Sequence, residues 1–414
     1  MAQLSPDRFA IGHDVLTVEQ AIAALKTRVQ PVAAVETLPL AAALGRTLAH
    51  DVIAPLPLPP FANSAVDGYA VRFSDLVPGG ETRLLVKGRI AAGAEGQGAE
   101  GACAIRIFTG APMPAGFDTV FMQEDVTRDG DWAVLPPGLK KSANARPAGE
   151  DVAEGSVALP AGTVLAAQHI ALAAALGQTQ IIVRRALRVA LFSTGNEVTE
   201  PGQPRPSAGI YDSNRALLRA LCTRPDLIVT DLGILPDNRP AIAKALAAAQ
   251  GHDVILTSGG VSLGEEDHVK AAVEDVGALN FWRMAIKPGR PVAMGTIGDA
   301  AFVGLPGNPV AVFVTFAAIV RPLMAALSGA DVTPPLPLPV VAGFAYRKKA
   351  GRREYVRVTL VKEGDHIIAN KHPRDGAGVL SSLTETDGLF VLPEDSESLA
   401  VGETAGFLAY AALL

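Results

Sequence analysis

The chain has 414 residues, more than one hydrophobic core usually serves, so its length predicts about two to four domains. Hydrophobic residues make up 49% and charged residues 19%, which excludes extensive disorder because enough apolar surface is present to fill cores. The formal net charge of -6 gives no overall attraction to nucleic acid or to an anionic membrane, so an anionic ligand would need a local cationic site.

Cysteine and histidine usage argues against two kinds of metal site. Cys103 and Cys222 lie far apart and form no CxxC pair, and the histidines form no HxxxH or HExxH pattern. The first twenty residues lack the pattern of a secretory signal, and no uninterrupted apolar run reaches the ~18 residues of a membrane span. The sequence therefore predicts a soluble, cytoplasmic protein without a membrane or nucleic-acid partner.

Residues 1–181 are predicted to form two intertwined domains. Apolar residues at helical spacing predict a helix over 15–28, with a second short helix over 39–48. After a proline-rich loop, short strand-like segments separated by glycines predict a β-rich domain over 51–150. A further helix follows at 166–176, so residues 1–50 and 151–181 are expected to form one discontinuous, helical and elongated N-terminal domain.

The remainder predicts two more domains. From 188 to 327, apolar strands alternate with helices, a pattern typical of a three-layer α/β domain with a parallel-rich sheet, here expected over 182–330. The proline-rich stretch TPPLPLP predicts a stiff linker. Strand-like segments separated by glycine turns then predict a small β domain over 331–414.

Chemistry in an α/β domain is expected where parallel strands end. The segment DVILT is followed by SGGVSLGEED, in which glycines allow close backbone approach to an anion and acids follow. A plain strand-to-helix turn is the alternative interpretation of this loop. Its candidate binding residues are Ser258, Gly259, Gly260 and Ser262, and its candidate catalytic acid is Asp267.

A second loop, STGNE, offers Ser193, Thr194, Gly195 and Glu197 at another strand end, and Asp237 follows a third strand. Mg²⁺ prefers a few carboxylates together with substrate phosphate oxygens. We therefore expect Glu197, Asp237 and Asp267 to be Mg²⁺ ligands, with solvated loop acids or helix caps as the alternative.

A third motif, KPGRP, places Lys287 and Arg290 three residues apart in a segment stiffened by prolines, with Pro291 closing it. Two cations held in this way suit an oxyanion. A solvated turn is the alternative.

Six segments in this order resemble the MoeA family of molybdopterin molybdenumtransferases, to which the E domain of gephyrin belongs. They are SAVDGYA, TGAPMPAGFDTV, STGNE, TSGGVSLGEEDHV, KPGRP and LPGNPV, and they span nearly the whole chain. The resemblance implies a four-domain homodimer with a β-rich second domain, a third domain shared with molybdopterin adenylyltransferases, and a C-terminal β-barrel.

The resemblance also implies the reaction. Molybdenum from molybdate would be inserted into adenylyl-molybdopterin with release of AMP, assisted by Mg²⁺. Glu197, Asp237 and Asp267 fall on the family's acidic positions, and Ser262, Lys287, Arg290 and Pro291 match positions near the pterin and molybdate. In the final domain, GRREYVR and GVLSSL match the family's pattern, so Arg352 and Ser381 become candidates for oxyanion binding or closure over the site. Asp67, Thr109 and Asp151 become candidate catalytic residues. From its residues alone, Asp67 would be a turn residue.

Four positions depart from the usual family pattern, namely Val66, Asn196, Arg283 and Ala311.

A molybdopterin adenylyltransferase and a non-catalytic dimeric scaffold stay open as alternative functions. Further expected partners are the molybdopterin adenylyltransferase and the apo-molybdoenzymes. The sequence does not distinguish molybdate from tungstate.

Overall fold

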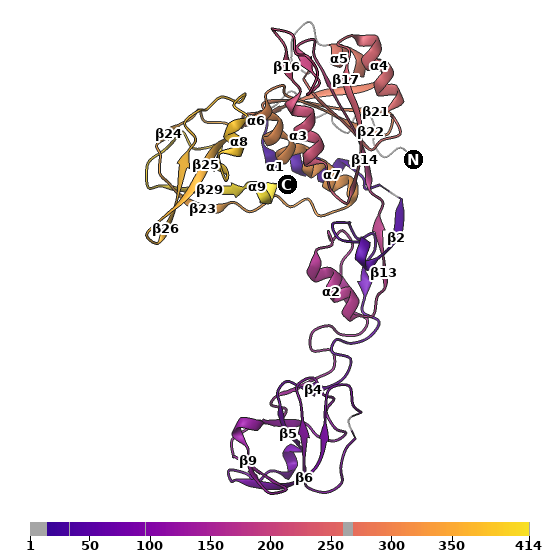
Figure 1. Ribbon diagram of the computed structural model, residues 1–414, viewed down its shortest axis with the longest axis vertical. Helices are drawn as coiled ribbons and strands as arrows, with labels where there is room; N and C mark the ends of the chain where they lie inside the picture. Colours follow the sequence, from indigo (N-terminus) through magenta and orange to yellow (C-terminus); the bar gives the residue numbers. More distant parts are fainter. Residues whose placement is uncertain (1–14, 33, 96, 260–267, 414) are drawn as a thin grey trace.

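The computed structural model describes residues 15–32, 34–95, 97–259 and 268–413. Figure 1 shows a long molecule in which an α/β body and a C-terminal β domain lie side by side at one end. A small β-rich body lies at the other end, and a narrow connector containing helix α2 (Ala167–Ala175) joins them. The functional residues expected in the β-rich body are thus far from those in the α/β body.

The α/β body is built on a seven-stranded sheet with the order β1-β19-β21-β22-β18-β14-β17. The neighbours β22, β18, β14 and β17 run parallel, whereas β21 is antiparallel to both of its neighbours. The parallel-rich sheet expected from the sequence is therefore confirmed as a mixed sheet with a parallel half. The strands are β1 (Val15–Leu16), β14 (Leu187–Thr194), β17 (Leu227–Leu235), β18 (Val254–Ser258), β19 (Gly277–Met284), β21 (Pro291–Ile297) and β22 (Ala300–Leu305).

Helices cover both faces of this sheet, which confirms the three-layer architecture. Successive residues of a strand point to opposite faces. Val189 and Leu191 of β14 therefore join the core under α1, α3, α6 and α7, while Ala190 and Phe192 join the core under α4 and α5. The helices are α1 (Val18–Arg28), α3 (Ser213–Leu221), α4 (Arg239–Ala248), α5 (His268–Val276), α6 (Pro309–Thr315) and α7 (Arg321–Ser328).

One long apolar helix runs from Pro309 to Ser328, through α6, a π-helical segment (Phe316–Val320) and α7. It is long and apolar enough to cross a membrane, but 78% of its most apolar window is buried inside the protein. The helix is therefore part of the core of the α/β body.

The connector is made of two separate stretches of chain. Strand β2 (Val35–Pro39) pairs with β13 (Gln180–Arg184), β3 (Val52–Ile53) pairs with β12 (Val157–Leu159), and α2 packs on them. The helix expected over 39–48 is instead a short 3-10 turn at Leu40–Ala42, because Gly45 turns the chain with a positive φ of 77°. Strand β1 and helix α1 belong to the core of the α/β body, where β1 pairs with β19.

The β-rich body contains a six-stranded sheet with the order β8-β5-β7-β6-β10-β9 and apolar clusters on both of its faces. The two-stranded pair β4 (Asn63–Ser64) and β11 (Ala145–Arg146) lies where this body meets the connector (Figure 1). The sheet strands are β5 (Gly68–Val71), β6 (Thr82–Ile90), β7 (Ala104–Ile107), β8 (Thr119–Met122), β9 (Thr127–Asp129) and β10 (Trp132–Leu135).

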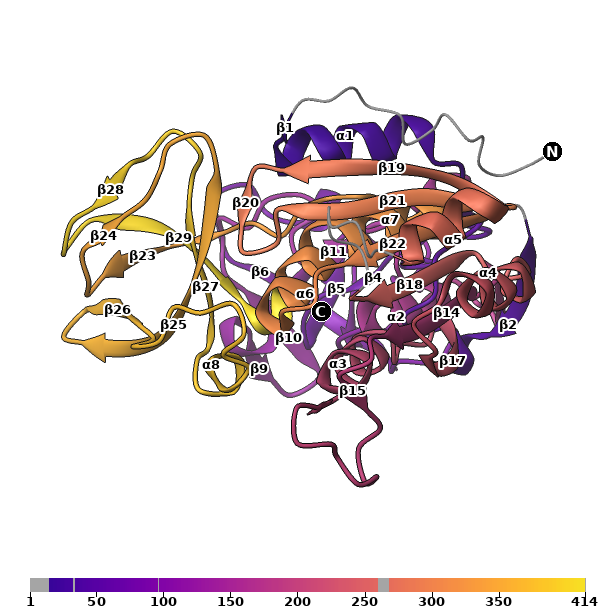
Figure 2. The ribbon, with the colours of Figure 1, turned by 90° about the horizontal axis from the view of Figure 1, so that it is seen from above.

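The C-terminal domain is a closed barrel, as the family resemblance implied. Its strands follow the order β25-β26-β23-β29-β27, and β27 pairs back onto β25. Strand β20 (Ile286–Lys287), which leaves the α/β body, pairs with β25 and ties the two domains together, and they lie side by side in Figure 2. The remaining elements are β15 (Val198–Thr199), β16 (Ile210–Tyr211), β23 (Leu338–Ala342), β24 (Tyr346–Arg347), β25 (Arg353–Glu363), β26 (His366–Lys371), α8 (Ser381–Thr384), β27 (Gly388–Leu392), β28 (Ser398–Leu399), β29 (Thr404–Ala409) and α9 (Tyr410–Leu413).

Candidate functional site

The parallel strands β17, β14, β18 and β22 bring several predicted residues to one edge of the sheet. Thr194 ends β14, and its Oγ1 donates a hydrogen bond of 3.2 Å to Oδ1 of Asp237, just after β17. Ser258 ends β18, and the N–H of Gly259 donates to the carbonyl of Leu305 at the end of β22. Gly260, Ser262 and Asp267 lie outside the described residues.

Asn214 is a residue of this edge that the sequence reasoning missed. It lies on α3, and its Nδ2 donates to Ser258 Oγ at 2.9 Å and to the Gly307 carbonyl at 2.7 Å. Its Oδ1 and the Oγ of Ser193 are buried without a hydrogen-bond partner among the described residues. Buried polar atoms are normally satisfied, so these two atoms point to a polar ligand at the edge. The available signal was the sequence YDSNR, in which Asp212 caps the helix that carries Asn214.

Glu197 folds back over Gly195. A Cβ at Gly195 would come within 2.7 Å of Glu197 Oε2, and the glycine has a φ of +142°. Both the close contact and the backbone conformation therefore disfavour any residue with a side chain at this position. Glu197 itself is exposed. Because Thr194 on β14 is in register with Leu235 on β17, Glu197 and Asp237 follow adjacent strand ends.

These two carboxylates fit an Mg²⁺ ion, which is commonly held by one or two protein carboxylates and by substrate phosphate oxygens. Among the described residues, no group of three or more His, Cys, Asp or Glu side chains is arranged to hold a metal ion. The third expected ligand, Asp267, is outside that part of the chain.

Lys287 and Arg352 converge on a buried carboxylate. Glu354 on β25 is 1% exposed, and it contacts Lys287 Nζ at 3.0 Å and Arg352 Nη2 at 2.7 Å. The hydroxyl of Tyr346 donates to the same carboxylate at 2.9 Å. Burial raises the pKa of Glu354, but these three hydrogen bonds outweigh it, so the net pKa is lowered. Lys287 and Arg352 are therefore both ion-paired with Glu354. Arg290 and Pro291, which follow Lys287 in the sequence, are exposed.

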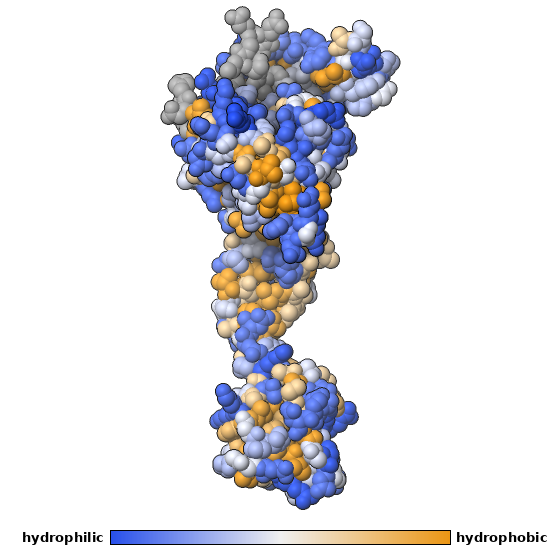
Figure 3. Space-filling view, turned by 90° about the vertical axis from the view of Figure 1, so that its left-hand side faces the viewer, coloured by the Kyte–Doolittle hydropathy of each residue, from blue (hydrophilic) through white to orange (hydrophobic). Residues whose placement is uncertain are grey.

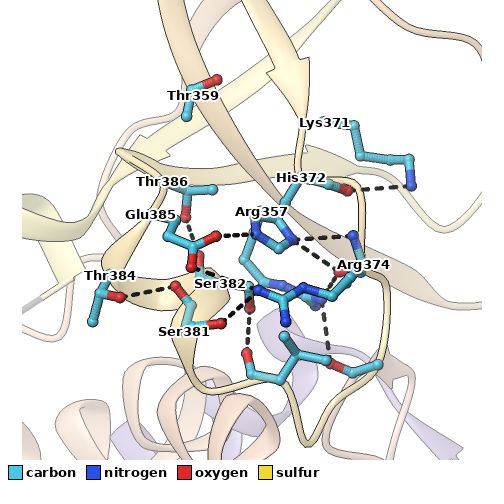
Figure 4. Close-up of polar contacts among 12 residues, drawn as sticks. Arg357, Thr359, Lys371, His372, Arg374, Ser381, Ser382, Thr384, Glu385 and Thr386 are labelled. Atoms are coloured by element: carbon cyan, nitrogen blue, oxygen red, sulfur yellow. Dashed lines mark hydrogen bonds and ion pairs between the residues drawn. The ribbon is translucent and has the colours of Figure 1, made fainter.

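Ser381 begins α8 in the C-terminal domain, and its Oγ accepts a hydrogen bond of 2.8 Å from Arg374 Nη2. Figure 4 shows the His372 ring between Glu385 and the backbone of Arg374, with the Arg374 guanidinium reaching Ser381. The same loop is joined to the α/β body, because the N–H of Val310 donates to the Ala377 carbonyl at 3.0 Å. Ser381 thus belongs to a loop that touches the LPGNPV turn.

Asp67 and Thr109 form a preorganised pair in the β-rich body. Both the N–H and the hydroxyl of Thr109 donate to Asp67 Oδ1 at 2.8 Å. These two hydrogen bonds hold the pKa of Asp67 below its usual range. Asp151 is exposed, and its backbone N–H donates to the Leu58 carbonyl. Figure 1 places this body at the opposite end of the molecule from β14 and β17.

Replacing Thr109 with valine is expected to raise the pKa of Asp67 towards its ordinary value, because one of the two hydrogen bonds to the charged carboxylate is lost. NMR titration of the Asp67 carboxyl carbon measures this pKa directly. The control is Thr109→Ser, which keeps both donors and should leave the titration unchanged. An identical titration for the valine variant would show that the hydroxyl does not stabilise the ionised form.

Two of the four residues that depart from the family pattern pack in the interior of their domains. Val66 packs against an apolar cluster of the β-rich body, and Ala311 is 3% exposed within α6. Asn196 and Arg283 are exposed.

Comparison with known proteins assigns the family. Residues 16–177 match the MoeA N-terminal region (domain I and II), residues 190–326 match the probable molybdopterin binding domain, and residues 339–410 match the MoeA C-terminal region (domain IV). The crystal structure of the molybdopterin biosynthesis moeA protein from Pyrococcus horikoshii superposes with a TM-score of 0.79 at 29% identity, covering 96% of this chain and 100% of that one.

Curated relatives agree with this match. The chain is 39% identical to the molybdopterin molybdenumtransferase of Haemophilus influenzae over 395 residues, which are 94% of this chain and 97% of that protein. It is 30% identical to Dictyostelium discoideum gephyrin over 424 residues, covering 89% of this chain and 58% of that protein. The alternative of an adenylyltransferase is set aside, because the match to molybdenumtransferases includes the β-rich and barrel domains. The chain therefore belongs to the MoeA family of molybdopterin molybdenumtransferases, enzymes of molybdenum cofactor biosynthesis.

Proposed function

We propose that this enzyme transfers molybdenum from molybdate to adenylyl-molybdopterin and releases AMP, with Mg²⁺ held by Glu197, Asp237 and Asp267. The observation that supports this best is the edge formed by β14, β17, β18 and β22. It combines a hydrogen-bonded carboxylate, exposed loop ends and buried polar atoms that have no hydrogen-bond partner in the described part of the chain. Parallel strand ends of this kind typically hold phosphate-containing ligands.

Each described residue of this edge has a task in the proposal. Thr194 donates to Asp237 and so orients its carboxylate, while Asn214 holds the Ser258 hydroxyl and the Gly307 carbonyl at fixed positions. Ser193, Gly195 and Gly259 complete the pterin and phosphate contacts, together with Gly260 and Ser262. Mg²⁺ bound to the carboxylates would offset the negative charge that develops on the leaving phosphate.

Molybdate is proposed to bind beside this edge, between the KPGRP segment and the barrel. Lys287, Arg290, Pro291, Arg352 and Ser381 are the proposed contacts. The hydrogen bond between Val310 and Ala377 supports this placement, because it brings the Ser381 loop to the turn at the end of β22. The same geometry suits tungstate, which has the same charge and tetrahedral shape.

We further propose a homodimer in which Asp67, Thr109 and Asp151 of one protomer complete the site of the other. Within one chain, β5, which Asp67 precedes, and β17, which Asp237 follows, lie at opposite ends of the molecule (Figure 1). Apolar side chains gather on the connector in Figure 3 and suit a second copy. The exposed apolar residues of the connector are Val35, Leu44, Ile53, Val157, Val164 and Ile182.

The buried free cysteines Cys103 and Cys222 fit the reducing cytoplasm, where we propose that the enzyme acts. The partners proposed there are the molybdopterin adenylyltransferase as the source of substrate and the apo-molybdoenzymes as recipients. Fluorescence microscopy of the tagged protein checks this location, and exclusion from the cytoplasm would contradict it.

Mixing two inactive variants tests the shared site. Asp67→Asn and Asp237→Asn should each slow AMP release by at least a hundredfold, because each removes a charge from the site. Asp267→Asn should behave like Asp237→Asn. In mixed dimers of Asp67→Asn with Asp237→Asn, one of the two sites keeps both carboxylates. Because random pairing makes about half of the dimers mixed, the mixture as a whole should regain about a quarter of the wild-type rate. The assay measures AMP released from adenylyl-molybdopterin with molybdate and Mg²⁺.

The matched control mixes Asp237→Asn with Asp267→Asn, which affect the same proposed site and should not restore activity. Failure of the first mixture to exceed this control would contradict site sharing. Absence of AMP release by the wild-type enzyme would contradict the proposed reaction itself.

A further inference from the structure

We propose that a stacked row of arginines and aromatic rings in the β-rich body binds the phosphate groups of the substrate held by the partner subunit. The row, here called the arginine ladder, consists of Arg128, Tyr69, Arg106, Phe108 and Arg89 in that order. The proposal rests on the homodimer and the substrate proposed above, and it adds a binding surface next to Asp67.

Each guanidinium of the ladder lies over an aromatic ring. Cζ of Arg106 is 4.6 Å from the centroid of the Phe108 ring and 5.3 Å from that of the Tyr69 ring. Arg89 lies over Phe108 at 4.7 Å, and Arg128 lies over Tyr69 at 5.8 Å. Strand pairing produces the row, because Tyr69 on β5 and Arg89 on β6 are both in register with Arg106 on β7. These three side chains therefore share one face of the sheet.

The ladder gathers three positive charges without a carboxylate between them. Among the described residues, none of its arginines forms an ion pair. By contrast, Arg83 of the same body lies over the Trp132 ring and is paired with Asp129 at 2.5 Å. Arg89 and Arg106 occupy paired positions on neighbouring strands, where like charges repel each other. A bound anion would remove this repulsion.

Stacking leaves the edges of the guanidinium groups available to an anion, because the ring covers a face while the N–H groups point outward in the plane. Some donors of Arg106 hold the protein, since its Nη1 donates to the Gly68 carbonyl at 2.8 Å and its Nη2 to Gln123 Oε1. Arg89 and Arg128, at the two ends of the ladder, are exposed. The ladder thus has a fixed centre and two cationic ends open to solvent.

The ladder adjoins the Asp67 and Thr109 pair. Gly68, whose carbonyl accepts from Arg106, follows Asp67 in the chain, and Phe108 precedes Thr109. The hydrogen bonds from Thr109 lower the pKa of Asp67, and the nearby charge of Arg106 lowers it further. In the proposed dimer Asp67 reaches the partner's site, so the phosphates of a substrate bound there would meet the ladder too. Cations at these phosphates would position the bond that releases AMP.

The competing interpretation is that the ladder only stabilises the sheet through cation–π contacts. Arg89→Gln separates the two roles, because it removes a charge at an exposed end and leaves Arg106 in place. We expect KM for adenylyl-molybdopterin to rise about tenfold while kcat changes by less than about twofold, since a contact made equally before and during the reaction is lost. Arg89→Lys keeps the charge and should keep KM within about threefold of the wild-type value.

The matched control is Arg83→Gln, because this exposed arginine also lies over a ring but is already paired with Asp129. Its KM should equal that of the wild type. Added salt should raise KM for the unmodified protein more than for Arg89→Gln, because salt screens the contact between charges. Equal KM values for wild type and Arg89→Gln would overturn the proposal, while AMP release by the wild type would still uphold the proposed reaction.

Mixed dimers test whether the ladder acts on the substrate of the partner subunit. When Arg89→Gln is added to the Asp237→Asn chain and mixed with Asp67→Asn, the one intact site uses the altered ladder, and KM should rise about tenfold. When Arg89→Gln is added to the Asp67→Asn chain instead, the intact site uses an unaltered ladder, and KM should equal that of the wild type. A raised KM in both arrangements, or in neither, would overturn the proposal, whereas site sharing is tested separately by the recovery of activity.

Discussion

Replacing Arg215 with methionine is expected to lower the free energy of unfolding of the α/β body by about 4 kcal/mol. The Arg215 side chain is 10% exposed and contacts three carboxylates. Its Nε is 3.0 Å from Asp212, its Nη1 is 2.6 Å from Asp231, and Glu200 is a third partner. Removing the cation leaves Asp212, which is 3% exposed, as a buried charge that keeps the backbone N–H of residue 215 as a partner but no counter-ion among the described residues. Chemical denaturation followed by circular dichroism measures the loss.

Arg219→Met on the same helix is the matched control. Its side chain is 68% exposed and lies 3.9 Å from Asp231, so the change in stability should stay within about 0.5 kcal/mol. If both variants lost a similar free energy of unfolding, the buried ion-pair network would not stabilise the protein more than a single exposed positive charge does.

The effect of Arg215 should also depend on pH. Burial raises the pKa of Asp231, but hydrogen bonds from Arg215 and Gly233 lower it by more, and the net pKa is below the ordinary 3.8. A depressed folded-state pKa stabilises the protein above the ordinary pKa, and this contribution is lost as the pH falls through the folded-state value. The difference in the free energy of unfolding between wild type and Arg215→Met should therefore be largest at neutral pH and should shrink below about pH 4.

Replacing Glu354 with glutamine is expected to destabilise the contact between the barrel and the α/β body by about 2 to 3 kcal/mol. Glu354 is the shared partner of Lys287, which comes from β20, and of Arg352 and Tyr346 in the barrel. The expected loss is smaller than for Arg215, because Lys287 is 48% and Arg352 35% exposed and water can solvate them.

Hydrogen exchange at the β20–β25 pairing reports this local loss, since Arg353 and Glu354 pair there with Ile286 and Lys287. The control is Glu363→Gln at the exposed end of the same strand, which should leave exchange at this pairing unchanged. Unaltered exchange in Glu354→Gln would show that backbone pairing alone holds the two domains together. A positive result would mean that Glu354 also sets the positions of two proposed molybdate contacts.

Local sequence patterns predicted much of the fold. Buried parallel strands were evident as continuous apolar runs, and RVALFS, DVILTS and AAFVGL became β14, β18 and β22. The intervening helices were equally evident from their length and spacing. The pattern could not show that β1 and α1 join the α/β core, because that depends on pairing with β19, more than 250 residues later in the chain.

The sequence also located the strand-end residues, because carboxyl ends of parallel strands must share one edge of a sheet. The motifs identified the family because several long segments in a fixed order are specific where a single one is not. Asn214 was missed because it stands in no distinctive motif. Its importance depends on its partners, which local sequence does not encode.

By itself, the sequence determined the order of the elements, the loops that carry acids and glycines, and the family, because these depend on local periodicity and on residue types at fixed spacing. Only the tertiary structure decided that Lys287 and Arg352 share the carboxylate of Glu354. It also placed β5, which Asp67 precedes, far from β17, which Asp237 follows. The physical reason is that electrostatic pairing and burial depend on distances between residues far apart in the chain, which only the folded backbone sets.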